Sequence, residues 1–240
     1  MMLPRYVALL LAVQLAAACA VENDVGAATA NRQDDAASPA AAATAAQQDR
    51  RLVLAFGDSL YAGYALDQGQ SFPAMLERML DERGVPAEVV NAGVSGDTTA
   101  GGLRRIAFTL DGLDRKPDLA IVGLGANDML RGLDPAETRR NLAAILDELK
   151  RREIPVMLTG MMASRSLGAD YVRRFEAIYP DLARDYGAEL DPFFMDNVIT
   201  DRSLLLADGL HPNAEGIRVI ARRLAPKVAQ LLEDRSSKAQ

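Results

Sequence analysis

Short runs of apolar residues alternate along this chain with longer stretches in which apolar residues recur every three or four positions. The apolar runs predict buried strands at residues 52–56, 87–91, 119–124 and 155–159, and a short strand that starts at 189–190. The longer stretches predict amphipathic helices at 72–82, 99–110, 135–152, 170–186 and from 212 to about 232. We expect the fourth helix to bend at Pro180. This alternation predicts an α/β fold with three α/β/α layers, flavodoxin-like, around a central parallel sheet of about five strands.

The first 50 residues have a different pattern, which predicts an export signal followed by a linker. Residues 1–19 combine a positive charge at Arg5 with an apolar run that ends in small residues, as in a secretory signal peptide. That run is too short to span a membrane comfortably. Residues 20–50 are rich in alanine and polar residues with almost no large apolar side chain, so we expect a disordered linker. The folded domain is therefore predicted at 51–233, with a polar tail at 234–240.

Two maturation sites fit the end of the apolar run. Residues 18–20 have the small-x-small pattern of an ordinary signal peptidase site, which gives a soluble secreted chain that starts at Val21. Residues 15–19 resemble a bacterial lipobox, which makes Cys19 the lipidated first residue. Cys19 is the only cysteine, so the chain forms no internal disulfide. We favour the lipoprotein, a bacterial protein exported to the periplasm or tethered to the outer membrane through Cys19.

The charge balance is acidic and argues against nucleic-acid binding. The 240 residues include 27 Lys and Arg against 33 Asp and Glu, a net charge of −6 at pH 7. Hydrophobic residues make up 49% of the chain and charged residues 25%, as in soluble globular proteins. No basic stripe with interleaved aromatic residues occurs, so we expect no nucleic acid as partner. The sequence leaves the oligomeric state open.

Four polar loops carry the candidate chemistry, and three of them directly follow predicted strands. They lie at 57–60, 91–99, 123–128 and 208–211. Because the carboxyl ends of parallel strands meet at one edge of a sheet, where ligands of such folds bind, we expect the loops to converge. The chain has one histidine, His211, and imidazole is the usual general base near neutral pH. Ser59 follows the first strand and Asp208 precedes His211 by three positions, in the chain order Ser, Asp, His of some Ser-His-Asp hydrolases.

A hydrolase of this kind needs a nucleophile, a base, a group that orients the base and donors for the developing oxyanion. We assign Ser59 as nucleophile, His211 as base and Asp208 as the orienting carboxylate. The oxyanion donors are predicted to be the backbone N–H groups of Ser59 and Gly93 and the side-chain amide of Asn127. Each residue alone also fits a helix cap or a turn, but their joint order over four loops favours the hydrolase.

These blocks resemble the SGNH (GDSL) hydrolases, which are named for a serine, a glycine, an asparagine and a histidine in four blocks. Ser59, Gly93, Asn127 and His211 fall on those blocks in order, and Asp208 lies in the D-x-x-H of the last one. The run 55–226 is similar to the bacterial arylesterase, acyl-CoA thioesterase and lysophospholipase branch. The resemblance implies an SGNH hydrolase domain that cleaves small-molecule or lipid esters, or thioesters, through an acyl-enzyme.

Five further residues beside these blocks are assigned to the substrate-binding region: Asp58, Leu60, Asp128, Met161 and Met162. For Asp58 and Asp128 we favour a structural role as loop anchors, with direct contact to the substrate as the alternative. Met161 and Met162 fit either the core or an adaptable apolar pocket. The segment 161–166 replaces a stretch that is often proline-rich in the branch that the chain resembles, so substrate preference does not transfer directly.

The sequence suggests no cofactor and no metal. It has no P-loop lysine motif, no dinucleotide-binding glycine fingerprint and no calcium-loop aspartates. One histidine and one cysteine, far apart in the chain, do not form a zinc cluster.

Two other functions remain as alternatives. An extracytoplasmic glycan O-deacetylase is disfavoured because the chain has no tryptophan and only 5% aromatic residues to stack on sugars. A non-catalytic ligand-binding module on a flavodoxin-like sheet is disfavoured by the complete set of serine, aspartate and histidine.

Overall fold

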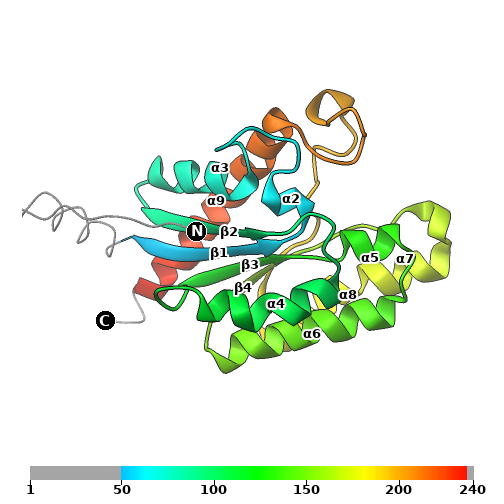
Figure 1. The fold of residues 1–240 in the computed structure, drawn as a ribbon, viewed down its shortest axis with the longest axis horizontal. Coiled ribbons are helices and arrows are strands. Elements are labelled where there is room, and N and C mark those ends of the chain that lie inside the picture. Colours follow the sequence, from blue (N-terminus) through cyan, green and yellow to red (C-terminus); the bar gives the residue numbers. More distant parts are fainter. Residues whose placement is uncertain (1–49, 237–240) are drawn as a thin grey trace, which may run out of the picture. The chain divides into compact units, whose positions relative to one another are not determined.

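The computed structural model of the protein describes residues 50–236. Its five strands form one parallel sheet in the order β2-β1-β3-β4-β5 (Figure 1). The strands are β1 (Arg51–Gly57), β2 (Ala87–Gly93), β3 (Leu119–Gly123), β4 (Val156–Thr159) and β5 (Glu189–Asp191). The predicted parallel sheet of about five strands is confirmed. The predicted signal peptide, Cys19 with its maturation sites, and the predicted linker as far as residue 49 lie outside the described residues.

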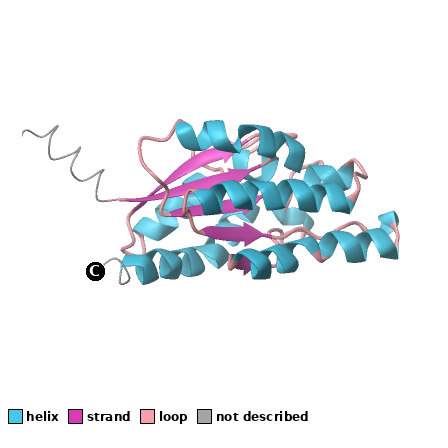
Figure 2. Cartoon of the chain, turned by 90° about the horizontal axis from the view of Figure 1, so that it is seen from below, coloured by secondary structure: helices cyan, strands magenta, loops and turns pink. Residues whose placement is uncertain are grey.

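Helices cover both faces of the sheet, so the elements form three layers (Figure 2). The α-helices are α2 (Ser59–Ala62), α3 (Phe72–Asp81), α4 (Thr99–Asp111), α5 (Ala126–Leu130), α6 (Pro135–Arg151), α7 (Ala169–Glu176), α8 (Ile178–Tyr186) and α9 (Ala214–Ser236). Two short 3₁₀ helices are η1 (Arg165–Leu167) and η2 (Arg202–Leu204). Helices α3 and α9 pack on one face, and α4, α6 and α8 on the other, each with its own cluster of buried apolar side chains. No helix among residues 50–236 is long and apolar enough to cross a membrane.

Strand β1 lies between β2 and β3 and is covered by helices on both faces. Val53 and Ala55 belong to the cluster under α3 and α9, whereas Leu54 and Phe56 belong to the cluster on the other face. All four side chains are fully buried. Because successive residues of a strand point to opposite faces, a strand covered on both faces must be apolar throughout. This explains the unbroken apolar run in the sequence.

The single helix predicted at 170–186, with a bend at Pro180, is wrong. The structure has two helices there, α7 and α8, with Ala177 between them. Pro180 has no N–H to donate to the carbonyl of Glu176 four residues earlier, and its ring would clash with that carbonyl. The interruption therefore lies one turn before the proline, and Pro180 itself occupies the first turn of α8, where it is tolerated.

Residues just outside the predicted domain 51–233 also take part in the described structure. Arg50, the last residue of the predicted linker, donates through Nη2 to Asp81 Oδ2 at 3.1 Å and to Glu77 Oε1 at 3.4 Å. At the other end, α9 continues to Ser236, three residues past the predicted limit at 233.

The start of α9 is anchored against η2, and this contact closes the loop that carries the histidine. Asn213 donates through its backbone N–H to the carbonyl of Leu204 at 2.9 Å and accepts from the N–H of Gly216 at 3.0 Å. A Cβ on Gly216 would lie 2.3 Å from the Leu204 carbonyl oxygen. The backbones of η2 and α9 therefore approach as closely as a glycine allows.

We predict that Gly216→Ala lowers the thermal unfolding temperature. Alanine is favoured over glycine by about 1 kcal/mol inside a helix, but here the added methyl group forces two backbone segments apart. Circular dichroism melting curves measure the effect. Glu215→Ala is the control in the same turn and should change stability little, because its pair with Arg218 is half-exposed. A Gly216→Ala protein that melts higher than wild type would contradict the tight contact.

Candidate active site

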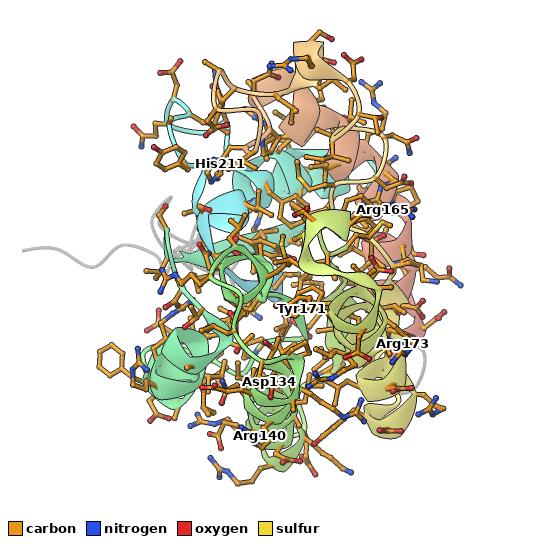
Figure 3. The ribbon with its side chains drawn as sticks, turned by 90° about the vertical axis from the view of Figure 1, so that its right-hand side faces the viewer. Asp134, Arg140, Arg165, Tyr171, Arg173 and His211 are labelled. Atoms are coloured by element: carbon orange, nitrogen blue, oxygen red, sulfur yellow. The ribbon has the colours of Figure 1, made fainter. Side chains whose placement is uncertain are left out.

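Three glycines in register form a platform at the carboxyl edge of the sheet. Gly57 ends β1 and pairs with Gly93 of β2 and Gly123 of β3. A Cβ on Gly57 or Gly123 would lie 2.4 Å from the ring of Tyr61, and one on Gly93 would lie 2.3 Å from the backbone nitrogen of Ala62. The short helix α2 therefore rests directly on the ends of three strands. This contact sets Ser59, the first residue of α2, at the edge where the loops converge, which Figure 3 views from outside.

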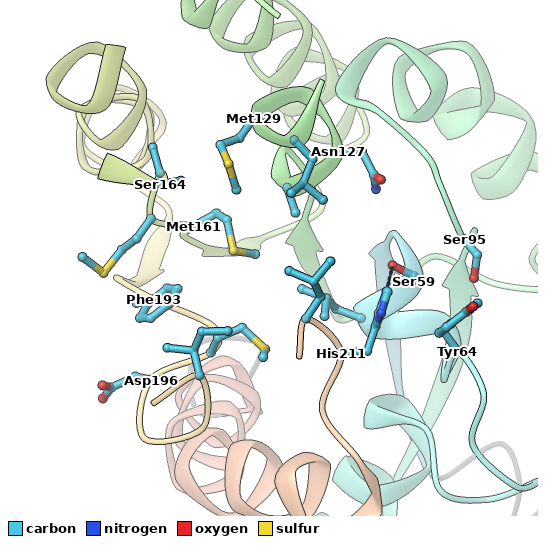
Figure 4. A pocket seen from close by; sticks show the side chains of 18 of the residues that line it. Ser59, Tyr64, Ser95, Asn127, Met129, Met161, Ser164, Phe193, Asp196 and His211 are labelled. Carbon is cyan, nitrogen blue, oxygen red and sulfur yellow. Dashed lines mark hydrogen bonds between the residues drawn. The ribbon is translucent and has the colours of Figure 1, made fainter. Parts of the chain in front are cut away.

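A continuous chain of hydrogen bonds links the three residues that the sequence singles out. Ser59 Oγ and His211 Nε2 are 2.9 Å apart (Figure 4), and His211 Nδ1 and Asp208 Oδ2 are 2.7 Å apart. The loop before α9 thus brings His211 to a serine 152 positions earlier in the chain. The structure brings all three predicted residues together.

The protonation state of Asp208 decides which atom donates in each of these two hydrogen bonds. The backbone N–H groups of His211 and Leu210, and then the imidazole, lower the pKa of Asp208 to about 2. The carboxyl is therefore ionised near neutral pH and has only acceptor atoms. Nδ1 of His211 must then donate to Asp208, so Nε2 of the neutral ring accepts from the Ser59 hydroxyl.

Asn127 lies close to the same serine, at the start of α5. Its Nδ2 donates to the carbonyl of Asp97 at 2.9 Å and approaches Asp58 Oδ2 at 3.4 Å. These contacts fix the amide at the edge of the pocket that Ser59 and His211 also line. Asn127 therefore lines the pocket together with Ser59, and to donate to an oxyanion its Nδ2 must give up one of these two acceptors, of which Asp58 is the more distant.

The structure does not bring Gly93, the second predicted oxyanion donor, to the wall of this pocket. Its backbone N–H donates to Asn91 Oδ1 at 3.0 Å, and a Cβ on it would meet the backbone of Ala62 in α2. Gly96, three residues later, lines the pocket together with Ser59 and Asn127. Its N–H has no acceptor among the residues that the structure describes. A sequence pattern alone does not separate the two glycines of this loop, because strand pairing decides where β2 ends.

The aromatic ring of Tyr64 packs against the imidazole, and the sequence analysis missed it. The two ring centroids are 4.5 Å apart with an interplanar angle of 34°. Tyr64 and Ser95 lie on one side of Ser59 in the pocket, whereas Met129, Met161 and Phe193 lie on the other side (Figure 4). The only signal in the sequence is that Tyr64 follows the predicted nucleophile loop.

Ser59 and His211 open into a pocket of about 930 Å³ whose walls are largely apolar. Its apolar lining includes Leu60, Met129, Leu130, Met161, Met162, Phe193 and Met195. The predicted substrate-binding residues Leu60, Met161 and Met162 thus lie on the pocket wall. This volume is in the usual range for sites that enclose a small organic ligand.

Asp58 and Asp128, which the sequence analysis assigns to the substrate-binding region, do not line the pocket. Both are about 1% exposed. Asp58 accepts from the N–H of Leu60 at 3.0 Å, and Asp128 accepts from the N–H of Thr99 at 2.8 Å and from the Thr138 hydroxyl at 3.2 Å. Since buried carboxylates need such donors, both residues anchor loops, the role favoured for them from the sequence.

Burial changes the titration of Asp58, the residue before the serine. Desolvation raises the pKa of Asp58 from its ordinary value of 3.8 to about 6, although the Leu60 N–H acts in the opposite direction. The folded state therefore binds this proton more tightly than the unfolded chain does.

Among residues 50–236, no cluster of histidine, cysteine and carboxylate side chains fits a metal ion.

Comparisons with known proteins agree with this geometry. Residues 55–219 match the GDSL-like Lipase/Acylhydrolase family. The chain is 37% identical to an arylesterase of Vibrio mimicus over 180 residues, 75% of this chain and 89% of the relative. It is 36% identical to thioesterase 1/protease 1/lysophospholipase L1 of Escherichia coli strain K12, over 75% of this chain and 84% of the relative. Among solved structures, the SGNH-hydrolase family esterase AlinE4 is 53% identical, with a TM-score of 0.66 over 76% of this chain and 96% of AlinE4.

We predict that Asp58→Asn changes the pH dependence of folding. Folding raises the pKa of Asp58 from 3.8 to about 6, so the folded state holds the proton more tightly than the unfolded chain does. The resulting stabilisation of the wild type is fully present below about pH 4 and is lost as the pH rises through about 6. The loss amounts to ~3 kcal/mol. The amide variant does not titrate, so its stability relative to wild type should rise between pH 4.5 and 7.5 in urea unfolding curves. An unchanged difference at the two pH values would show that Asp58 is not the titrating group.

Proposed function

The chain belongs to the GDSL-like lipase/acylhydrolase family and is an ester-hydrolysing serine hydrolase, and from this premise we propose that Ser59, His211 and Asp208 form its catalytic triad. The observation that carries the proposal is the hydrogen-bonded chain from Asp208 through His211 to Ser59 at the floor of an apolar pocket. The ionised Asp208 supports it, because a carboxylate on Nδ1 stabilises the imidazolium that forms when the serine loses its proton.

In the proposed reaction, Ser59 Oγ attacks the carbonyl carbon of the ester while its proton moves to His211 Nε2. The carbonyl oxygen becomes an oxyanion, for which the backbone N–H groups of Ser59 and Gly96 and the amide of Asn127 are the proposed donors. The C–O or C–S bond to the leaving group then breaks as that group takes the proton from His211. Water, deprotonated by His211, releases the carboxylic acid from Ser59 and restores the hydroxyl.

We propose that the substrates are apolar carboxylic esters or thioesters, with lipid acyl esters among them. The methionine-rich wall of the pocket supports this, because unbranched thioether side chains adapt to acyl chains of different shape. Several large exposed apolar side chains also line the pocket: Tyr64, Leu130, Met162, Ile199 and Leu210. The names of two relatives, an arylesterase and thioesterase 1/protease 1/lysophospholipase L1, also support ester and thioester substrates. An apolar wall does not favour a glycan O-deacetylase.

We predict that Ser59→Ala abolishes ester turnover with little effect on folding. Members of a triad act as a unit, so the expected loss in kcat is on the order of 10⁴-fold or more. Hydrolysis of p-nitrophenyl esters from acetate to palmitate measures turnover and also orders the acyl chains by preference. A fluorophosphonate probe should label wild type at Ser59 alone, as located by mass spectrometry. A Ser59→Ala protein that keeps most of the wild-type rate, or that is labelled elsewhere, contradicts the proposal.

We also propose that the protein is exported and acylated at Cys19. The support is the lipobox-like segment 15–19, in which Cys19 is the only cysteine of the chain. Stable anchoring needs more than one acyl chain, which lipoprotein processing supplies.

We predict that wild type follows the membrane fraction after cell lysis, whereas Cys19→Ala moves to the soluble fraction. Mass spectrometry of the mature N-terminus distinguishes the two maturation routes. A soluble wild-type protein that begins at Val21 would establish ordinary secretion and remove the lipid anchor.

A further inference from the structure

Arg105 of α4 donates hydrogen bonds to the ends of β1 and β2 and to the loop that follows β2, although it does not line the pocket. Its Nε donates to Asp97 Oδ2 at 2.7 Å, its Nη1 to the carbonyl of Ala92 at 2.9 Å, and its Nη2 to the carbonyl of Gly57 at 2.9 Å. Each nitrogen of the guanidinium therefore has a separate acceptor. The side chain is 20% exposed, so these contacts are largely shielded from water.

A contact with an aromatic ring fixes the plane of the guanidinium, in addition to the hydrogen bonds of its nitrogens. The group stacks on Phe56 with its central carbon 4.0 Å from the ring centroid, and Phe56 is fully buried in β1. A cation held on an aromatic face loses little by partial burial. With one face on Phe56 and three donors engaged, Arg105 has no alternative orientation that keeps these contacts.

The three acceptors belong to the segments that carry the proposed oxyanion donors. Gly57 comes two residues before Ser59, and Ala92 comes shortly before Gly96. The carbonyl of Asp97 accepts the hydrogen bond from Asn127 Nδ2 at 2.9 Å. One side chain thus ties together the backbone leading to Ser59, the backbone leading to Gly96, and the residue that holds Asn127.

The sequence around Asp97 is adapted to this arrangement. A Cβ on Gly101 would lie 1.9 Å from Asp97 Oδ1, so only a glycine lets that carboxylate rest against the first turn of α4. Thr98 caps the same turn by accepting from the N–H of Gly101 at 3.2 Å. Asp97 is therefore held from two sides, by α4 and by Arg105.

We propose that Arg105 is a positioning residue for the ester hydrolysis: it sets the relative places of the Ser59, Gly96 and Asn127 donors without touching the substrate. The proposal rests on the function proposed above. Oxyanion stabilisation depends on donors that are already placed where charge develops, so a displacement of about 1 Å can cost about 100-fold in rate. Binding of the uncharged substrate in the apolar pocket depends far less on that placement.

The shape of the guanidinium, and not only its charge, is needed. A lysine at this position keeps a charge near Asp97, but its ammonium is a compact point charge and cannot reach three acceptors in one plane. Arg105→Lys therefore separates the charge from the geometry. Arg105→Met keeps the length of the side chain and removes both.

The test compares Arg105→Met and Arg105→Lys with a matched control, Arg152→Met. Arg152 is 22% exposed and pairs with Asp111 and Glu148, each at 2.7 Å, so it resembles Arg105 in burial and pairing. It lies at the end of α6, opposite the pocket. We expect Arg105→Met to lower kcat on the order of 10- to 100-fold with KM within threefold of wild type. Arg105→Lys should recover only part of kcat, and Arg152→Met should retain the wild-type kcat.

A double-mutant cycle gives a readout that loss of stability alone does not produce. Asn127→Ala should lower kcat by roughly 10²- to 10³-fold. If Arg105 acts through the donors, adding Arg105→Met to Asn127→Ala should cost much less than Arg105→Met costs in the wild-type background.

Three results would overturn the proposal: a change confined to KM, strictly multiplicative losses in the cycle, or an equal kcat loss in Arg152→Met. A wild-type protein without ester turnover would instead refute the proposed function. Turnover in wild type with undiminished kcat in Arg105→Met would refute the role of Arg105 alone.

Discussion

The close approach of α2 to the ends of three strands is the constraint on which the site depends. Gly57, Gly93 and Gly123 lie in one row across β2, β1 and β3, and a side chain on any of them would displace α2. The row also leaves room for Tyr61, whose buried hydroxyl lies 2.8 Å from the Thr159 hydroxyl of β4. Helix α2 is thereby in contact with four strands of the sheet, and these contacts set the position of Ser59 at its first residue.

The carboxyl group directly before the serine is buried, and this burial changes its pKa. Asp58, directly before Ser59, and Asp128 of α5 are both buried and accept from backbone and hydroxyl donors. Burial raises the pKa of Asp58 to about 6, whereas half-exposed Asp208 keeps a pKa of about 2 because two N–H groups and the imidazole point at it. The pKa values of the two carboxyls therefore move in opposite directions, because Asp58 is buried away from water and Asp208 is exposed enough that its donors dominate.

Much of the architecture follows from the order of apolar and polar residues. A strand buried on both faces, such as β1, must be apolar at every position, and a helix on a sheet must repeat at 3.6 residues, so both appear in the sequence with nearly correct limits. Elements of one turn, such as α2 and α5, are too short to show a period. The break between α7 and α8 was misplaced because the effect of Pro180 falls on the carbonyl four residues earlier.

The sequence by itself determined the parallel α/β order and the residues Ser59, Asp208 and His211, because the chain offers one imidazole and the loops after parallel strands meet at one edge. Only the tertiary structure decided which glycine of the second loop faces the pocket. Gly93 is the last residue of β2 and lies against α2, whereas Gly96 lines the same pocket as Ser59. It also decided that Asp58 and Asp128 are buried while Met161 and Met162 are not. The reason is physical: where a strand stops and which way a loop side chain points depend on pairing and packing between segments distant in the chain, and a local pattern carries no record of those contacts.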